Sequence, residues 1–288
     1  MQLGVVFPQT EIGADPGPIR AYADAVAELG FRHVLAYDHV VGADPSAYPG
    51  WSRPYNLYST FHEPFVLFAY LAGISDLELV TGILILPQRQ TVLVAKQAAA
   101  VDLLSGGRLR LGVGIGWNPV EYDALGQDFA TRGARLSEQV GLLRRFWTEE
   151  SVTFAGRFDH VNGVGLAPLP VQRPIPVWIG GTSDRALRRA GQLGDGWFPQ
   201  VAPGAGLEES MEIVASAAAE AGRDPATLGM EGRMQVGHGD LDQIAGEAAR
   251  WRAAGASHLS LNTMGSGLAT PDDHIAALAA AMPAVSGA

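Results

Sequence analysis

The sequence predicts an α/β fold, a (β/α)8 TIM barrel. Eight short apolar segments alternate with eight segments in which apolar residues recur at helical spacing. The apolar segments are apolar at successive positions, which is typical of parallel strands covered on both faces. A chain of 288 residues also has room for eight strand–helix units, because barrels of this type need about 250 residues.

A doubly wound open sheet is the alternative arrangement of such units. That fold usually opens with a Gly-x-Gly-x-x-Gly turn after its first strand, whereas here Pro8, Gln9 and Thr10 follow the first apolar segment. The sequence contains no internal repeat and no low-complexity linker. We therefore favour the barrel and expect a single domain over residues 1–288.

The predicted elements follow one another in strict alternation. We expect strands at residues 3–7, 33–37, 78–86, 109–115, 177–180, 196–200, 230–236 and 258–262. We expect helices at residues 18–29, 63–74, 92–104, 132–147, 183–193, 207–221, 241–254 and 272–282.

Two irregular segments interrupt this alternation. Residues 41–61 form a long loop rich in proline and aromatic side chains. Residues 153–176 carry several glycines and four prolines, and they predict a short hairpin inserted between the fourth and fifth strands. Ordered loops of this length in a compact fold usually serve function.

Composition excludes several classes of function. A formal net charge of −10 argues against nucleic acid or an anionic membrane as partner, and the absence of cysteine excludes disulfides and thiolate chemistry. We see no signal peptide and no apolar segment long enough to span a bilayer, so we expect a cytoplasmic protein. No histidine pair has metal-ligand spacing, and no nucleophile elbow or Walker loop is present, so metal, hydrolase and kinase sites are not expected.

Two adjacent glycines follow the fifth predicted strand. Gly180 and Gly181 let the backbone approach a ligand closely, and Thr182 leads into a helix whose first N–H groups and positive dipole end favour an anion. The segment predicts a site for the phosphate of a cofactor. An ordinary strand-to-helix turn is the alternative.

Other polar residues also follow predicted strands, where a barrel binds its ligands. They are Gln9, Asp38, His39, Asn118, Gln200, Asn262 and Thr263. His39 is the strongest catalytic candidate, because an imidazole can donate a hydrogen bond or transfer a proton near neutral pH. The alternative is a buried histidine bonded to the backbone. Asp38 points to the other side of the extended chain and could fix the loop instead of touching a ligand.

The fourth strand carries glycines at 112, 114 and 116, within the strand and not at the start of a helix, so they are a weak match to a dinucleotide fingerprint. Small residues there let a flat ring lie against the strand, or simply ease barrel packing. We expect Gly116, Trp117 and Asn118 near the ligand, with a plain core tryptophan as the alternative for Trp117. Arg89, beyond the third strand, could bind an anionic tail or cap the next helix.

Together these motifs resemble the bacterial luciferase-like monooxygenase superfamily, in particular its coenzyme F420-dependent oxidoreductases. The resemblance extends over residues 3–282. It is carried by residues 36–40, 81–90, 95–97, 103–109, 112–117, 121–122, 125–126, 179–182 and 194–197.

The resemblance implies a TIM barrel with a flavin-type cofactor at the carboxyl ends of the strands. Members place the ring against a bulge of the third strand, often with a non-proline cis peptide, which here would fall within residues 82–85. The implied ring contacts are therefore Gly82, Ile83 and Leu84. The phosphate would bind Gly180, Gly181 and Thr182, and Asp38 and His39 match a pair whose histidine lies beside the reactive face of the ring.

One departure concerns the sugar-phosphate dehydrogenases of this superfamily. They carry a glutamate proton donor directly after the glycines of the fourth strand, where this chain has Trp117. Lys96 is the only lysine, so the pocket is not rich in lysine either. Oxidation of glucose 6-phosphate by the same residues is therefore not expected.

We expect an oxidoreductase that uses F420, or alternatively FMN, to transfer a hydride to or from a small organic substrate, or to oxygenate it. A non-catalytic flavin- or deazaflavin-binding protein is a second hypothesis. A third is an aldolase or isomerase, which usually needs a lysine or glutamate at a strand end. Apolar faces of helices 63–74 and 92–104, and the resemblance itself, further predict a homodimer.

Overall fold

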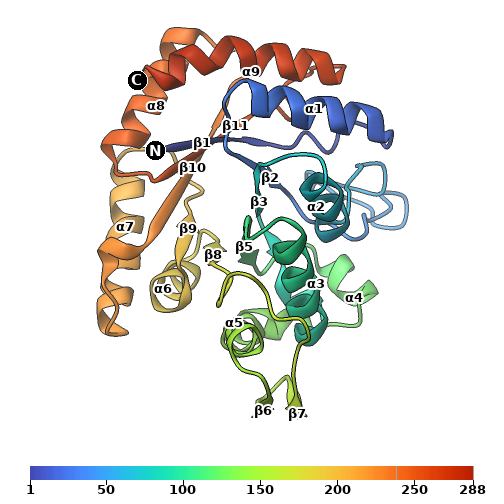
Figure 1. The fold of residues 1–288 in the computed structure, drawn as a ribbon. Helices are drawn as coiled ribbons and strands as arrows, with labels where there is room; N and C mark the ends of the chain where they lie inside the picture. Colours follow the sequence, from blue (N-terminus) through green and yellow to red (C-terminus); the bar gives the residue numbers. More distant parts are fainter. Residues whose placement is uncertain (238, 288) are drawn as a thin grey trace.

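A computed structural model describes residues 1–237 and 239–287. Parallel strands close into a barrel of eight staves, and the third stave is made of two consecutive strands (Figure 1). The strands of the barrel are β1 (Gln2–Val6), β2 (His33–Ala36), β3 (Glu78–Thr81), β4 (Leu84–Ile85), β5 (Leu109–Gly114), β8 (Val177–Gly180), β9 (Gly196–Phe198), β10 (Gly229–Gln235) and β11 (His258–Asn262).

Closure of the barrel is visible in the register of β1. Gly4 of β1 lies opposite His33 of β2 on one side and opposite Ser260 of β11 on the other, both in parallel. Parallel pairings continue through β10, β9, β8 and β5 to β3 and β4, and β3 pairs with β2. Because all staves run the same way, their carboxyl ends meet at one rim, which confirms the predicted barrel.

Helices surround the strands (Figure 1). They are α1 (Pro16–Glu28), α2 (Pro64–Ala72), α3 (Thr91–Leu104), α4 (Pro119–Ala124), α5 (Arg132–Thr148), α6 (Asp184–Leu193), α7 (Ala205–Glu220), α8 (Leu241–Ala253) and α9 (Pro271–Ser286). Large side chains such as Trp147, Phe146 and Trp251 are fully buried between helices and sheet. The indole N–H of Trp147 also donates to the Ala95 carbonyl at 3.1 Å, which ties α5 to α3.

The third stave differs from the single strand predicted at 78–86. It breaks between Thr81 and Leu84, where the Gly82–Ile83 peptide is cis, and a short 3-10 helix, η1 (Leu86–Gln88), follows β4. The break lies inside the predicted range, but periodicity carries no signal for it, because every residue there is apolar or small.

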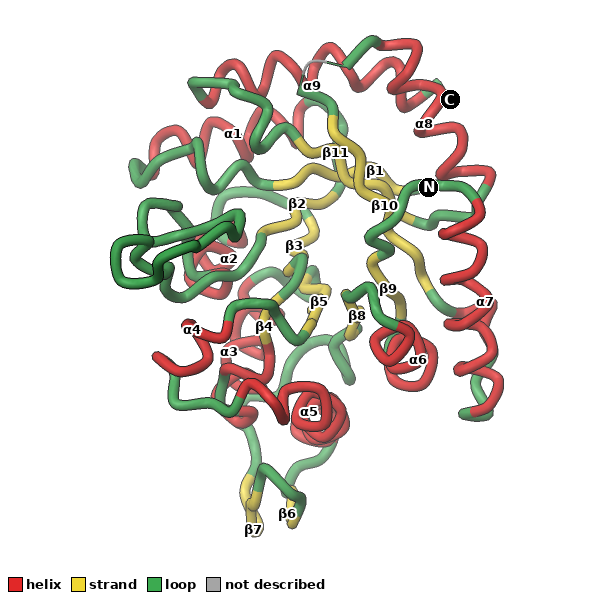
Figure 2. The backbone as a smooth tube through the Cα atoms, turned by 180° about the vertical axis from the view of Figure 1, so that it is seen from behind, coloured by secondary structure: helices red, strands yellow, loops and turns green. Residues whose placement is uncertain are grey.

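The predicted insertion between the fourth and fifth staves is confirmed. Strands β6 (Val152–Ala155) and β7 (His160–Val164) form an antiparallel hairpin away from the barrel (Figure 1). The sequence analysis missed α4 and two further 3-10 helices, η2 (Phe129–Thr131) and η3 (Pro225–Thr227). The loop at 41–61 contains no helix or strand and folds back on itself beside α2 (Figure 2). No helix of the described residues is both long and apolar enough to cross a membrane.

The interior of the barrel has a charged layer below an apolar one. The Arg110 guanidinium contacts Glu78 at 3.0 Å and also pairs with Glu231, and His33 Nε2 lies 3.0 Å from Glu231 Oε1. Burial opposes ionisation of Glu231, but Arg110 and His33 outweigh it and hold its pKa well below the usual range. Above this layer pack five buried apolar side chains: Val6, Leu35, Val80, Trp178 and Phe198. The lower barrel is therefore filled, and space for a ligand lies at the carboxyl-terminal rim.

Candidate active site

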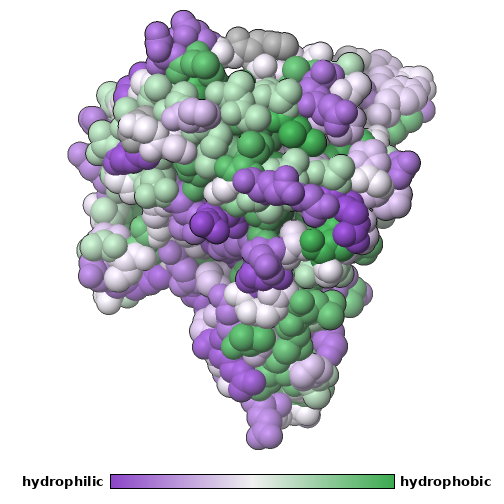
Figure 3. All heavy atoms as spheres, turned by 45° about the horizontal axis from the view of Figure 1, so that its top comes forward, coloured by the Kyte–Doolittle hydropathy of each residue, from purple (hydrophilic) through white to green (hydrophobic). Residues whose placement is uncertain are grey.

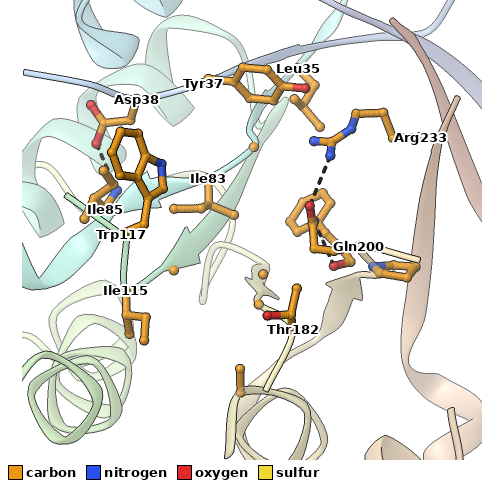
Figure 4. A pocket seen from close by; sticks show the side chains of 18 of the residues that line it. Leu35, Tyr37, Asp38, Ile83, Ile85, Ile115, Trp117, Thr182, Gln200 and Arg233 are labelled. Atoms are coloured by element: carbon orange, nitrogen blue, oxygen red, sulfur yellow. Dashed lines mark hydrogen bonds between the residues drawn. The ribbon is translucent and has the colours of Figure 1, made fainter. Parts of the chain in front are cut away.

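A cavity of about 550 Å³ lies at this rim. It is lined by residues of six strands and of the segments that follow strands, which is where a barrel binds its ligands. Figure 4 shows Ile83 in the middle of the cavity, with Trp117 and Asp38 on one side and Arg233 and Gln200 on the other. The cavity thus has an apolar floor and two chemically different walls.

His39, at the first wall, is held by a buried carboxylate. Its Nδ1 lies 3.1 Å from Oε2 of Glu121, a side chain with no exposed surface. The other oxygen of Glu121 accepts from the backbone N–H of Val40. Burial opposes ionisation of Glu121, but these hydrogen bonds outweigh it and lower its pKa. An ionised carboxylate only accepts, so the shared proton resides on Nδ1 and Nε2 of the neutral ring keeps its lone pair.

Aromatic rings surround the imidazole of His39. The ring centres of Phe61, Tyr55 and Trp117 lie 4.9, 5.2 and 5.4 Å from that of His39. Phe61 and Tyr55 belong to the loop at 41–61, which therefore forms part of this wall. Such rings exclude water and provide flat apolar surface for an organic ligand. Among residues 1–237 and 239–287, no cluster of acidic and histidine side chains has the geometry to hold a metal ion.

Asp38 positions the third stave. Its Oδ2 accepts from the Ile85 N–H at 2.9 Å, and its Oδ1 contacts the Arg89 guanidinium at 2.8 Å. Arg89 also pairs with Glu63 at the start of α2. Asp38 reaches the cavity lining, but its carboxylate is fully used by these contacts (Figure 4). Arg89 takes part in the same buried cluster and does not line the cavity.

Glycines on two neighbouring strands make room for Ile83. A Cβ atom on Gly114 or on Gly180 would lie 2.8 Å from the Ile83 side chain, closer than real Cβ atoms approach. A Cβ on Gly82 would meet the Leu35 side chain at 2.1 Å. Because these three positions lack side chains, Ile83 lies low in the rim and the space above it stays open to a flat ligand.

The start of α6 forms the side of the cavity below Gln200 in Figure 4. Gly180, Gly181, Thr182 and Ser183 all line the cavity there. Ser183 is the N-cap, and its hydroxyl accepts from the Ala186 N–H. A Cβ on Gly181 would lie 2.5 Å from the Cβ of Ala186, so only glycine fits this close approach. First-turn N–H groups have no partners inside a helix, so this end can receive an anion.

The structure brings most of the predicted site residues together. His39, Asp38, Gly82, Ile83, Gly116, Trp117, Gly180, Gly181 and Thr182 all line the cavity. Leu84 does not: it is fully buried and pairs with Val113 in the barrel wall. Asn118 is also outside the lining, because its side chain caps α4 by accepting from the Val120 N–H at 3.1 Å. Gln9 lies outside as well, and its amide bonds the Tyr37 carbonyl.

The sequence analysis did not assign a role to Glu121, Tyr37, Tyr55 or Arg233. A usable signal existed for Glu121, because it falls at the third position of a helix that Asn118 and Pro119 begin. A glutamate there has its carboxylate near the carboxyl end of the preceding strand. No motif in the sequence around Arg233 indicates a role for it. Only the alternation of side chains along β10 directs Arg233 toward the barrel interior.

We expect Gly180→Ala to displace Ile83. The new methyl group overlaps Ile83, so it should lower the free energy of unfolding by about 1–3 kcal/mol. In an Ile83→Ala background the same change should cost much less, because its neighbour is gone. Urea unfolding of the four proteins of this cycle measures the coupling. Gly141→Ala, on an open face of α5, is the control and should be neutral or stabilising. Equal costs in both backgrounds would show that Ile83 does not occupy this space.

Comparison with known proteins identifies the family. The model of the luciferase-like monooxygenases matches residues 1–274. The chain is 35% identical over 197 residues to an uncharacterized protein of Mycobacterium tuberculosis, which is 62% of this chain and 68% of that protein. It is 30% identical over 255 residues to an F420-dependent hydroxymycolic acid dehydrogenase of the same organism, covering 87% and 66%.

Among solved structures, an F420-dependent secondary alcohol dehydrogenase in complex with an F420-acetone adduct superposes with a TM-score of 0.80. The match covers 99% of this chain and 98% of the other at 18% identity, so it concerns the fold. Together with the match over nearly the whole chain, the barrel and its rim lead to one conclusion: the chain belongs to the luciferase-like monooxygenase family of enzymes.

Proposed function

We propose that this protein is a coenzyme F420-dependent oxidoreductase that transfers a hydride between the cofactor and a small organic substrate. One observation carries the proposal: a histidine held by a buried carboxylate lines a cavity in which glycines leave room for Ile83 and for a flat ligand above it. An F420-dependent dehydrogenase among the relatives supports the choice of cofactor.

The cavity fits a tricyclic ring with an anionic tail. Its volume of about 550 Å³ suits a ligand of that size. A side chain at Gly114 or Gly180 would clash with Ile83, which would then have to move into the space that the ring needs. In this arrangement Gly82, Ile83, Gly116 and Trp117 contact the ring, and Gly180, Gly181 and Thr182 receive the phosphate. A bound deazaflavin supplies a carbon centre that accepts or returns a hydride.

The chain's own residues handle the proton. When an alcohol is oxidised, its C–H bond gives up a hydride and its O–H bond gives up a proton. Nε2 of His39 accepts that proton, while Glu121 keeps Nδ1 protonated and stabilises the resulting positive charge. In the reverse direction His39 returns the proton. Asp38 acts through the backbone of Ile85 and does not take part in proton transfer.

The sequence leaves FMN as the alternative cofactor, because both molecules have a tricyclic ring, a ribityl chain and a phosphate. Titration of the purified protein with each, followed by fluorescence, distinguishes them. We expect micromolar or tighter binding of F420 and weaker binding of FMN. Tight binding of FMN without binding of F420 would reverse the assignment and favour an FMN-dependent monooxygenase.

We expect His39→Ala to lower turnover of the F420-loaded enzyme by about 10²–10⁴-fold, because it removes the proton acceptor. Glu121→Gln should give a smaller loss, since the amide keeps the shape but neither fixes the tautomer nor balances the charge. Initial rates with a panel of short secondary alcohols measure both effects. Nitrogen chemical shifts of His39 by NMR provide a substrate-free measurement: they should change in Glu121→Gln. Full activity of His39→Ala with unchanged cofactor binding would remove His39 from the mechanism, whereas a wild type that binds the cofactor but shows no turnover would favour a storage protein.

We further propose a homodimer formed through α2 and α3. These neighbouring helices expose apolar side chains, with Val66 70%, Leu93 52% and Leu104 64% exposed. Hydrophobic surface also gathers on the tapered lower part of the molecule in Figure 3. A second copy of the chain would bury these side chains.

Light scattering after gel filtration should give twice the mass of the chain. Leu93→Glu should shift it toward the monomer, because the substitution places a charge in the interface. Leu241→Glu, at an exposed apolar position on α8, should leave the mass unchanged. A wild-type monomer at micromolar concentration contradicts the proposal.

A further inference from the structure

Among residues 1–237 and 239–287, Arg233 is the only arginine or lysine that lines the cavity. It lies on β10, where Glu231 and Arg233 face the barrel interior while Met230 and Met234 pack into the outer core. In Figure 4 its guanidinium lies across the cavity from Trp117, with Ile83 between them. The wall opposite His39 therefore carries a fixed positive charge.

This charge has no carboxylate partner. No ion pair of the part of the chain that the structure describes includes Arg233. Glu231, two residues earlier on the same face, is already bonded to Arg110, His33 and Ser260 in the layer below. The two arginines thus differ: Arg110 is held between two carboxylates inside the barrel, whereas Arg233 lines the cavity without forming an ion pair to another described residue.

Neighbouring groups hold Arg233 in place without neutralising it. Its Nη2 donates to Gln200 Oε1 at 3.0 Å, and its guanidinium lies 5.5 Å from the ring centre of Tyr37. A guanidinium has five N–H donors, so most of them remain available to a ligand. The Gln200 amide nitrogen donates one hydrogen to the Phe198 carbonyl in a long bond of 3.3 Å, and its second hydrogen can be donated to a ligand.

We propose that Arg233 and Gln200 form an oxyanion-binding site inside the cavity, which receives a carboxylate or phosphate group of a bound ligand. Both side chains are exposed at the rim, where a ligand can reach them, and the planar fork of arginine matches two oxygens of such a group. Arg233 lies on β10 and Gln200 follows β9, so this site is distinct from the start of α6, although Gln200 lies between Arg233 and Thr182 in Figure 4.

This proposal rests on the proposed function, and it restricts the ligands of the cavity to those that carry a carboxylate or phosphate group. The oxyanion has two sources. It can belong to the substrate, which would then be a small organic acid or phosphate ester with its reacting carbon toward His39. It can instead belong to the tail of the cofactor. Both sources share the same chemistry, and binding measurements separate them.

Isothermal titration calorimetry of the full-length chain with three probes tests the site. The probes are F420, its deazaflavin chromophore without the phosphate-containing tail, and inorganic phosphate added with and without the chromophore. Arg233→Met removes the charge but keeps the length of the stem, and we expect a loss of about 10- to 100-fold for the probe that uses the site. Arg233→Lys should recover part of the affinity, because it retains charge without the fork.

Two controls keep the test interpretable. Arg20→Met, which removes an exposed charge on α1, should bind all probes like the wild type. Thermal unfolding shows whether each variant folds, and Gln200→Leu provides a second variant that leaves the charge intact. It should weaken the same probe by about 3- to 10-fold through loss of one hydrogen-bonding group.

The pattern of losses identifies the source. Weaker binding of F420 with unchanged binding of the chromophore assigns the site to the cofactor tail. Weaker binding of phosphate with unchanged binding of F420 assigns it to the substrate. The proposal is overturned if folded Arg233→Met and Gln200→Leu bind all three probes like the wild type. A wild type that binds phosphate through Arg233 but neither deazaflavin would reject the proposed function and leave the oxyanion site standing.

Discussion

The arrangement of the cavity wall around His39 depends on one buried carboxylate. Glu121, on α4, connects the end of β2 with the segment after β5 through its bonds to His39 and to the Val40 amide. A charged group with no exposure to water is costly unless each oxygen has a partner, so both bonds are needed to keep it there. Once it is there, it fixes the orientation and the tautomer of His39. The largely buried imidazole of His39 thereby keeps the lone pair of its Nε2 free, as the proposed proton transfer requires.

The barrel distributes charge unequally along its axis. In the lower layer one guanidinium, that of Arg110, contacts the two carboxylates of Glu78 and Glu231. At the rim the single guanidinium of Arg233 faces the cavity, opposite a histidine that is paired with its own carboxylate. The cavity therefore combines an apolar floor, a wall that carries the paired histidine and a wall that carries a guanidinium. Such polarity restricts both the kind and the orientation of the ligands it accepts.

Most of the rim could be predicted from the sequence because strand ends are local features. Gly180 and Gly181 follow an apolar run directly, and His39 follows another, so closure of the barrel was enough to bring them together. Leu84 and Asn118 differed from the prediction for a local reason. After the Gly82–Ile83 break, the alternation of side chains directs Leu84 into the barrel wall. The side-chain amide of Asn118 caps the helix that follows it.

By itself, the sequence determined the order of strands and helices, the barrel and the family, because periodicity, glycine positions and motif spacing are properties of neighbouring residues. It also placed His39 and the paired glycines at the rim. The tertiary structure alone decided which side chains meet across it: Glu121 with His39 over 82 residues, and Arg233 with Gln200 over 33. Such contacts depend on the register and closure of the whole sheet, which bring together residues that lie far apart in the sequence.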